Sequence, residues 1–218
     1  VPIEIHWSQV PGRDEKWKEE TIKNTSAEQF RQEFETEFIG STNTLIHPSK
    51  LRSLVFHNPL RSDDGLDILI EPKSGRTYTL TVDVAEGQGL DYSAFSIFDV
   101  TEFPYRQVAK YRSNQIAPLL LPTKILTAAK LYNDAFVLIE INSIGLQVAD
   151  ILHFELAYEN LVKIEMKGKQ GQQHTPGFKK KIAFGLKTTA QTKMIGCTNL
   201  KALIENDKLI INDADTIM

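Results

Sequence analysis

The feature that most constrains the fold is a short apolar run at Ala135–Ile141, which reads AFVLIEI. A run of this length and composition indicates a strand that is buried on both faces. Such a strand needs a layer of structure on each side of its sheet, so it predicts an α/β fold. Glu140 stands inside this run, and a buried carboxylate is costly unless it is paired or bound to a metal.

Three more strands are predicted upstream of this run. In Arg76–Val84, apolar residues alternate with three threonines and Asp83, so the two sets point to opposite faces. Ser93–Val100 and Tyr105–Tyr111 follow after short connections. Two consecutive antiparallel hairpins are the simplest arrangement of these strands.

The rest of the chain alternates between helices and strands. Helices are expected at Leu121–Tyr132, Leu146–Leu156 and Thr192–Glu205, and strands at Leu161–Met166 and Lys208–Ile211. The predicted order is β-β-β-α-β-α-β, followed by a loop, a helix and a last strand. This order describes a mixed central sheet flanked by helices.

The first 60 residues follow a different pattern, with helix signals but no strand. Asp14 is placed to cap a helix that contains Trp17. Ser26 and Gln29 have the spacing of a capping box at the start of a second helix.

Behind that box, Phe30, Phe34 and Phe38 recur at helical spacing, which indicates a core or a docking surface. The turn-rich stretch Ile39–Asp67 is expected to hold little regular structure beyond a short helix at Pro48–Val55. We therefore predict a helical and irregular segment over residues 1–60 and a sheet domain over residues 61–218.

Composition excludes several classes of protein. The net charge of -3 provides no global basic field for nucleic acid. Cys197 is the only cysteine, which excludes an internal disulfide and a cysteine-based zinc site. No apolar run approaches a membrane span, and no signal peptide opens the chain, so we expect a protein that is not secreted. The chain lacks an initial Met and ends abruptly at Met218, so we expect a piece of a longer protein.

Asp83 and Glu140 each stand at the end of a predicted strand. In α/β sheets, functional side chains gather at strand ends, so the two carboxylates would converge if the strands are neighbours. Hard oxygen ligands of this kind suit Mg²⁺ or Mn²⁺. Two such ions could activate a water and stabilise the leaving 3′ oxygen in phosphodiester hydrolysis. Asp83 would bridge the ions, and Glu140 would hold the second ion or position the water.

Asp91 is a lesser candidate ligand, because the glycine-containing turn Ala85–Tyr92 would fold it back toward Asp83. A structural role remains open for two of these residues. Asp83 could simply cap a turn, and loop aspartates such as Asp91 are mostly just solvated.

A local cationic block stands out in this acidic chain between Lys163 and Lys193, where Glu165 is the only acid. Such a segment could neutralise DNA phosphates without reading sequence, or it could be a solvated flexible insertion. The expected DNA-contacting residues are Lys167, Lys169, Lys179, Lys180, Lys181 and Lys187.

Three stretches together resemble the large terminase subunit of T-even-type tailed phages. They are YTLTVDVAEGQGLDYSAFSIFDVT at Tyr78–Thr101, VLIEINSIG at Val137–Gly145 and KMIGCTNLKALIENDKLII at Lys193–Ile211. The segment AEQFRQEFETEFIGS at Ala27–Ser41 resembles the stretch that joins the ATPase domain of that protein to its nuclease domain. The resemblance covers nearly the whole chain in the right order.

The resemblance implies an RNase H-like fold and a Mg²⁺- or Mn²⁺-dependent endonuclease. The enzyme would cut concatemeric double-stranded DNA at the initiation and termination of genome packaging, in the cytoplasm of the infected bacterial host. The catalytic Asp and Glu of the family fall on Asp83 and Glu140, and the aspartate after the glycine turn falls on Asp91. The implied partners are double-stranded DNA, an upstream ATPase domain, the portal and the small terminase subunit. Residues 1–60 would then be the linker and docking segment from the ATPase domain.

One implied residue has no counterpart in this sequence. The family places a third essential Asp in a His-Asp-Asp segment after the last strand, and that segment would lie past Met218. Asp213 and Asp215 follow the last predicted strand, but the motif around them does not match. The nuclease core over residues 61–218 is therefore expected to be incomplete at its C-terminal end.

Two other functions compete with a nuclease. Actin-like ATPases and sugar kinases share the β-β-β-α-β-α order, although they usually need two such domains. A non-catalytic module that docks on a packaging motor would fit the phenylalanine stripe and the missing third aspartate.

Overall fold

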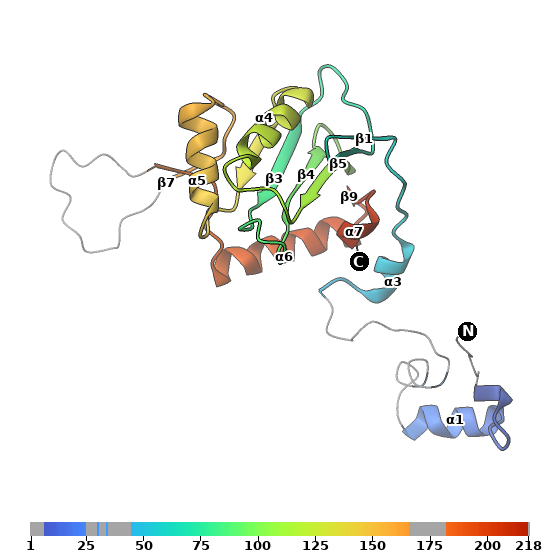
Figure 1. Ribbon diagram of the computed structural model, residues 1–218. Helices are drawn as coiled ribbons and strands as arrows, with labels where there is room; N and C mark the ends of the chain where they lie inside the picture. The colour runs from blue at the N-terminus through green and yellow to red at the C-terminus, as the bar shows by residue number, and fades with distance from the viewer. Residues whose placement is uncertain (1–6, 25–29, 31–33, 35–44, 166–181, 218) are drawn as a thin grey trace. The chain divides into compact units, whose positions relative to one another are not determined.

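The computed structural model describes residues 7–24, 30, 34, 45–165 and 182–217 (Figure 1). The chain forms two compact units, Val1–Arg52 and Ser53–Met218. The expected capping box at Ser26 and the third phenylalanine, Phe38, lie outside the described residues.

The described residues of the first unit form the short helices η1 (Trp7–Gln9) and α1 (Glu15–Asn24), and α3 (Pro48–Ser53) stands at its end. The predicted cap of α1 is confirmed, since the Asp14 carboxylate accepts a hydrogen bond of 2.8 Å from the Trp17 backbone N–H. This bond satisfies one of the amides that the first turn of a helix leaves without a partner.

An aromatic cluster holds this unit together. Trp17 contacts Phe30 and Phe34, with ring centroids 5.7 and 5.1 Å away, and the Trp7 ring lies 5.7 Å from that of Phe30. Phe30 is only 1% exposed, so this part of the phenylalanine stripe packs inward rather than facing a partner.

The second unit is built on a mixed sheet. β3 (Tyr78–Asp83), β4 (Ser93–Asp99) and β5 (Tyr105–Ser113) form the predicted antiparallel meander. β6 (Phe136–Ile139) lies parallel to β3, with Val82 beside Ile139. The two strands that carry the predicted carboxylates are therefore neighbours.

The other side of the sheet contains strands that the sequence reasoning partly missed. β1 (Arg61–Asp63) and β2 (Leu66–Ile68) form a hairpin around Asp64-Gly65, and β2 pairs with β5. The prediction of little regular structure here was wrong, because three-residue strands are too short to show a period. β9 (Leu209–Ile210) runs parallel to β5.

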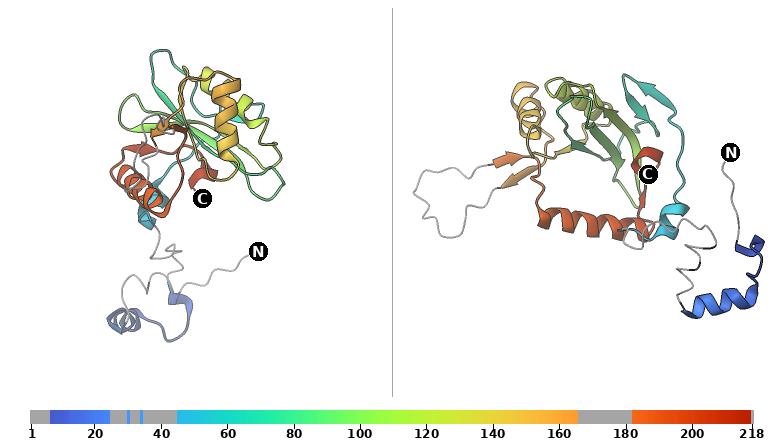
Figure 2. Two further views of the ribbon diagram at one scale, coloured as in Figure 1. Left: turned by 90° about the vertical axis from the view of Figure 1, so that its left-hand side faces the viewer. Right: turned by 60° about the horizontal axis from the view of Figure 1, so that its bottom comes forward.

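Two helices cover one face of the sheet and enclose the core. These are α4 (Leu121–Leu131) and α5 (Gly145–Asp150), which continues into a π-helical turn, η2 (Ile151–Glu155). α6 (Ala190–Glu205) lies on the opposite side of the sheet (Figures 1 and 2). No described helix is both long and apolar enough to cross a membrane.

The prediction that the apolar run is buried on both faces was wrong. Val137 and Ile139 are fully buried against the helices, but Phe136 is 51% exposed and Leu138 is only half-buried. The apolar run therefore marks one covered face, and the face that bears Leu138 remains open.

Two short strands form a second, two-stranded sheet beyond β6. β7 (Lys163–Glu165) falls within the predicted strand Leu161–Met166, whereas its partner β8 (Ile182–Phe184) was not predicted. After β9, a short helix, α7 (Ala214–Ile217), was also not predicted.

Candidate metal centre

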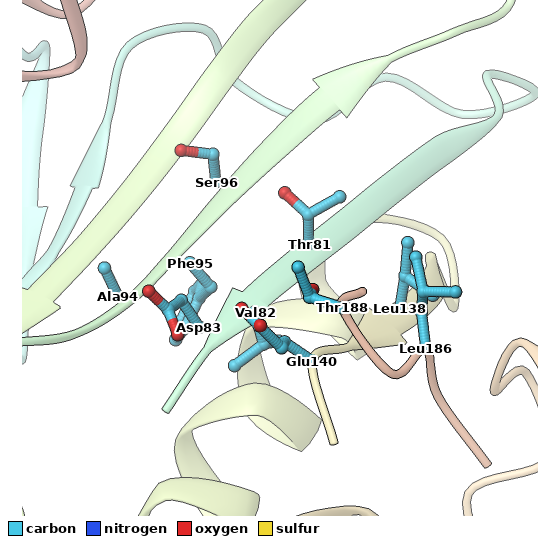
Figure 3. A pocket seen from close by; sticks show the side chains of 10 residues that line it. All are labelled: Thr81, Val82, Asp83, Ala94, Phe95, Ser96, Leu138, Glu140, Leu186 and Thr188. Carbon is cyan, nitrogen blue, oxygen red and sulfur yellow. The ribbon is translucent and has the colours of Figure 1, made fainter. Parts of the chain in front are cut away.

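The carboxylates of Asp83 and Glu140 come from adjacent ends of two parallel strands. Asp83 is the last residue of β3, and Glu140 directly follows β6. The backbone N–H of Glu140 donates to the Val82 carbonyl at 3.0 Å, which holds the two strand ends together. In Figure 3, both side chains reach into the same pocket.

This pocket has a volume of about 300 Å³ and opens on the uncovered face of the sheet. Asp83 and Glu140 are the only ionisable groups among the described residues that line it. Its other lining residues are mostly small or apolar, namely Thr81, Val82, Ala94, Phe95, Ser96, Leu138, Leu186 and Thr188. No Lys, Arg or His of the described chain pairs with either carboxylate. The pocket therefore concentrates negative charge.

The electrostatics of Asp83 reflect this concentration. Partial burial in the pocket raises the pKa of the Asp83 carboxyl above its usual value, and the nearby charges of Glu140 and Asp91 raise it further. A hydrogen bond from the Val84 backbone offsets only part of this effect. A bound cation would relieve the repulsion, which favours a metal-binding role over a simple turn cap.

The turn after β6 fixes the position of Glu140. The Asn142 side chain donates to the Glu140 carboxylate at 2.8 Å and to the Thr188 carbonyl at 3.3 Å. Gly145 packs so closely that a Cβ atom there would lie 1.9 Å from the Glu140 carbonyl oxygen. The sequence reasoning missed both residues, although a glycine and an amide just after a strand end are a typical signal of such a turn.

The donor set of the pocket fits a hard cation. Two carboxylates provide the oxygen ligands that Mg²⁺ and Mn²⁺ prefer. The Asn142 side-chain oxygen beside Glu140 is buried and has no hydrogen-bond partner, so a further polar group would satisfy it. In the described chain, no three His, Cys, Asp or Glu side chains group closely enough to hold a metal ion, so the centre is a pair of acids.

Asp91 lies at the edge of this site rather than inside it. It is exposed in the loop between β3 and β4 and does not line the pocket, although its charge reaches Asp83. Its role as a lesser ligand stays a prediction.

The end of the predicted basic segment lies beside the pocket. Leu186 pairs with Glu140, donating its N–H to the Ile139 carbonyl at 2.8 Å. Lys187 is exposed between two pocket-lining residues. The other five expected DNA-contacting lysines lie outside the described residues: Lys167, Lys169, Lys179, Lys180 and Lys181.

Asp213 and Asp215 do not join the pocket, in line with their mismatch to the family motif. They bind the ammonium group of Lys110 at 2.6 and 2.7 Å. Asp213 also accepts two hydrogen bonds of 2.8 Å from Thr216. These carboxylates are therefore neutralised within the protein.

A sequence profile described as Terminase RNaseH-like domain matches residues 80–217, from β3 to α7. The chain belongs to this family. The resemblance to large terminase subunits is thereby confirmed at the level of the terminase family, while the likeness to T-even-type phages in particular stays a prediction. Membership also argues against the actin-like and sugar-kinase alternatives.

Solved structures of terminase nucleases share this fold. The large terminase nuclease of thermophilic phage G20c with bound magnesium has a TM-score of 0.60 at 16% identity, covering 81% of this chain and 77% of that one. The same values hold for its structure with bound cobalt. Its structure with bound zinc has a TM-score of 0.57 at 16% identity, covering 78% and 82%. The predicted RNase H-like fold is confirmed.

Proposed function

We propose that this chain is the nuclease domain of a large terminase, a metal-dependent endonuclease that cuts concatemeric double-stranded phage DNA when genome packaging starts and ends. The observation that carries the proposal is that Asp83 and Glu140 share one open pocket, in which no Lys, Arg or His of the described residues pairs with either carboxylate. Family membership supports it, as do the G20c nuclease structures with bound magnesium, cobalt and zinc.

In this proposal, Asp83 and Glu140 hold one or two Mg²⁺ or Mn²⁺ ions. A bound ion of this kind lowers the pKa of a water molecule and stabilises the charge that develops on a leaving oxygen. Asn142 keeps the Glu140 carboxylate oriented toward the pocket through its 2.8 Å hydrogen bond. Asp91 adds negative charge at the rim and is a weaker candidate ligand.

The open face of the sheet leaves room for a DNA strand above the acids. Contacts to phosphates would bind DNA with little sequence preference. The lysines of the basic segment, including Lys187 beside the pocket, would provide such contacts. The further partners in this proposal are the upstream ATPase domain, the portal and the small terminase subunit, in the cytoplasm of the infected bacterium. Residues 1–60 would connect the nuclease to the ATPase domain.

Plasmid cleavage by the full-length protein tests the proposal. With Mg²⁺ or Mn²⁺, we expect supercoiled plasmid to be converted to nicked and linear forms. Asp83→Asn and Glu140→Gln should each reduce the rate by at least about 100-fold, because each removes a metal ligand. Glu155→Gln, an exposed acid on η2, is the matched control and should cut like the wild type.

Two outcomes would count against the proposal. Full activity in both pocket variants would mean that the site is elsewhere. If the wild type cuts with neither ion, the chain would instead be a non-catalytic docking module.

A further inference from the structure

Two cations of β5, Lys110 and Arg112, lie on the same open face of the sheet as the carboxylates. The register places Asp83 beside Ala94 and Ala94 beside Arg112, and Thr81, Ser96 and Lys110 form the next row. Residues paired across neighbouring strands point to the same face, so Arg112 and Lys110 share the face of the pocket. Because two strand spacings separate β3 from β5, the Cα atom of Arg112 lies about 10 Å from that of Asp83 across the strands.

No bulky side chain of β4 separates Asp83 on β3 from Arg112 on β5. Ala94 and Ser96 stand between them, and both are small residues that line the pocket. β3, β5 and β6 also run in the same direction, so Asp83, Glu140 and Arg112 all lie near the ends of parallel strands. A DNA strand lying over the acids would continue across Ala94 toward Arg112.

Lys110 and Arg112 differ in exposure and in their binding partners. The Lys110 side chain is only 13% exposed and is bound by Asp213 and Asp215, with Asp67 at 4.0 Å. The Arg112 side chain is 46% exposed, and its guanidinium stacks on the Tyr92 ring at 3.8 Å. Stacking holds the face of the guanidinium and leaves its N–H edges free to bind an oxyanion.

An anion already lies beside Arg112. The same Asp215 carboxylate oxygen that binds Lys110 is 3.7 Å from the Arg112 guanidinium. The hydrogen bond from Lys110, together with the charges of Lys110 and Arg112, lowers the pKa of the Asp215 carboxyl. Asp215 is itself half exposed, so an incoming phosphate could replace it at Arg112 without unpacking the core.

We propose that Arg112, held by Tyr92, binds a backbone phosphate next to the scissile one and so positions DNA over Asp83 and Glu140. Asp215 is the internal carboxylate that competes with this phosphate for Arg112. This assignment rests on the proposed nuclease function and adds a positioning residue to it.

The test is DNA binding by the full-length protein in EDTA, where binding can be measured without cutting. A labelled duplex of arbitrary sequence is titrated at several salt concentrations. Arg112→Gln should weaken binding about 5- to 10-fold and reduce the slope of log K against log salt by about 0.9, which corresponds to one phosphate contact. Arg112→Lys should restore most of the slope, because it keeps the charge.

The matched control is Arg106→Gln. Arg106 is also an exposed arginine on β5, but it lies at the opposite end of the strand, where its neighbour in the β4 register is Asp99. Its removal should leave the salt slope unchanged. Asp215→Asn keeps a polar side chain beside Lys110 but removes the competing charge, so it should tighten DNA binding about 2- to 5-fold.

An unchanged salt slope in Arg112→Gln would overturn the proposal, as would a loss in Arg106→Gln of the same size. Failure of Asp215→Asn to tighten binding, in a variant with the wild-type melting temperature, would refute the competition. None of these results depends on cutting. Failure of the nuclease function would instead appear as unchanged plasmid cleavage in Asp83→Asn.

Discussion

Two groups of carboxylates occupy the same side of this molecule, and their surroundings differ. Asp83 and Glu140 share a pocket in which no described cation pairs with them, and partial burial together with repulsion from Glu140 raises the pKa of Asp83. Asp213 and Asp215 share the Lys110 ammonium group at 2.6 and 2.7 Å. An acid whose charge is balanced inside the protein, as in the group of Lys110, Asp213 and Asp215, serves the fold. An acid that has no cationic partner in a pocket is a candidate for binding an external cation.

The largest expected effect on stability comes from removing the cation shared by Asp213 and Asp215. Lys110→Met would leave the buried Asp213 carboxylate without its cation, and should lower the free energy of unfolding by about 2–4 kcal/mol. Chemical denaturation at neutral pH measures this loss. Lys130→Met is the control, because the ion pair of Lys130 with Asp134 is exposed and should be worth under about 1 kcal/mol. Equal losses in both variants would show that the Lys110 group is not structural.

A second variant displaces the backbone of Glu140 in the pocket of Asp83 and Glu140. In Gly145→Ala, the new methyl group would collide with the Glu140 carbonyl and displace the carboxylate. We expect plasmid cleavage to fall about 10-fold or more, and stability to fall by roughly 1–3 kcal/mol. Gly196→Ala in α6 has open space at its Cβ position and should be slightly stabilising. Wild-type cleavage by Gly145→Ala would mean that the turn does not position Glu140.

Asp83 and Glu140 could be singled out from the sequence because their signals are local. A glutamate that ends an apolar strand and an aspartate that ends an alternating one are visible in a window of a few residues. Their strands are parallel neighbours, a condition that the sequence alone left open.

The group of Lys110, Asp213 and Asp215 was not predicted, because it depends on contacts between distant parts of the chain. Asp213 meets Lys110 only because the two-residue strand β9 pairs in parallel with β5. The hairpin of β1 and β2 was missed for a related reason, since very short strands are defined by their partners rather than by a repeating pattern. Asn142 was missed because its role depends on a hydrogen bond to Glu140 and another to the distant Thr188.

The smallest expected effect is a gain in stability without metal. Because the pKa of Asp83 is raised in the folded state, its ionisation costs stability as pH rises from the unfolded-state pKa of about 3.9 through the folded-state pKa. The cost is absent below this window and complete above it. Asp83→Asn should therefore raise the melting temperature in EDTA by about 1–3 °C at pH 7, and by less at pH 4. A lower melting temperature at pH 7 would show that Asp83 is a structural cap.

We propose that Asp83 and Glu140, and not Asp213 and Asp215, hold the catalytic metal. Anomalous diffraction from Mn²⁺-soaked crystals of the protein tests it most directly, since the peak locates the ion. We expect a manganese peak between the carboxylates of Asp83 and Glu140, and loss of that peak in Asp83→Asn. A peak at Asp213 and Asp215 alone, with none in the pocket, would contradict it.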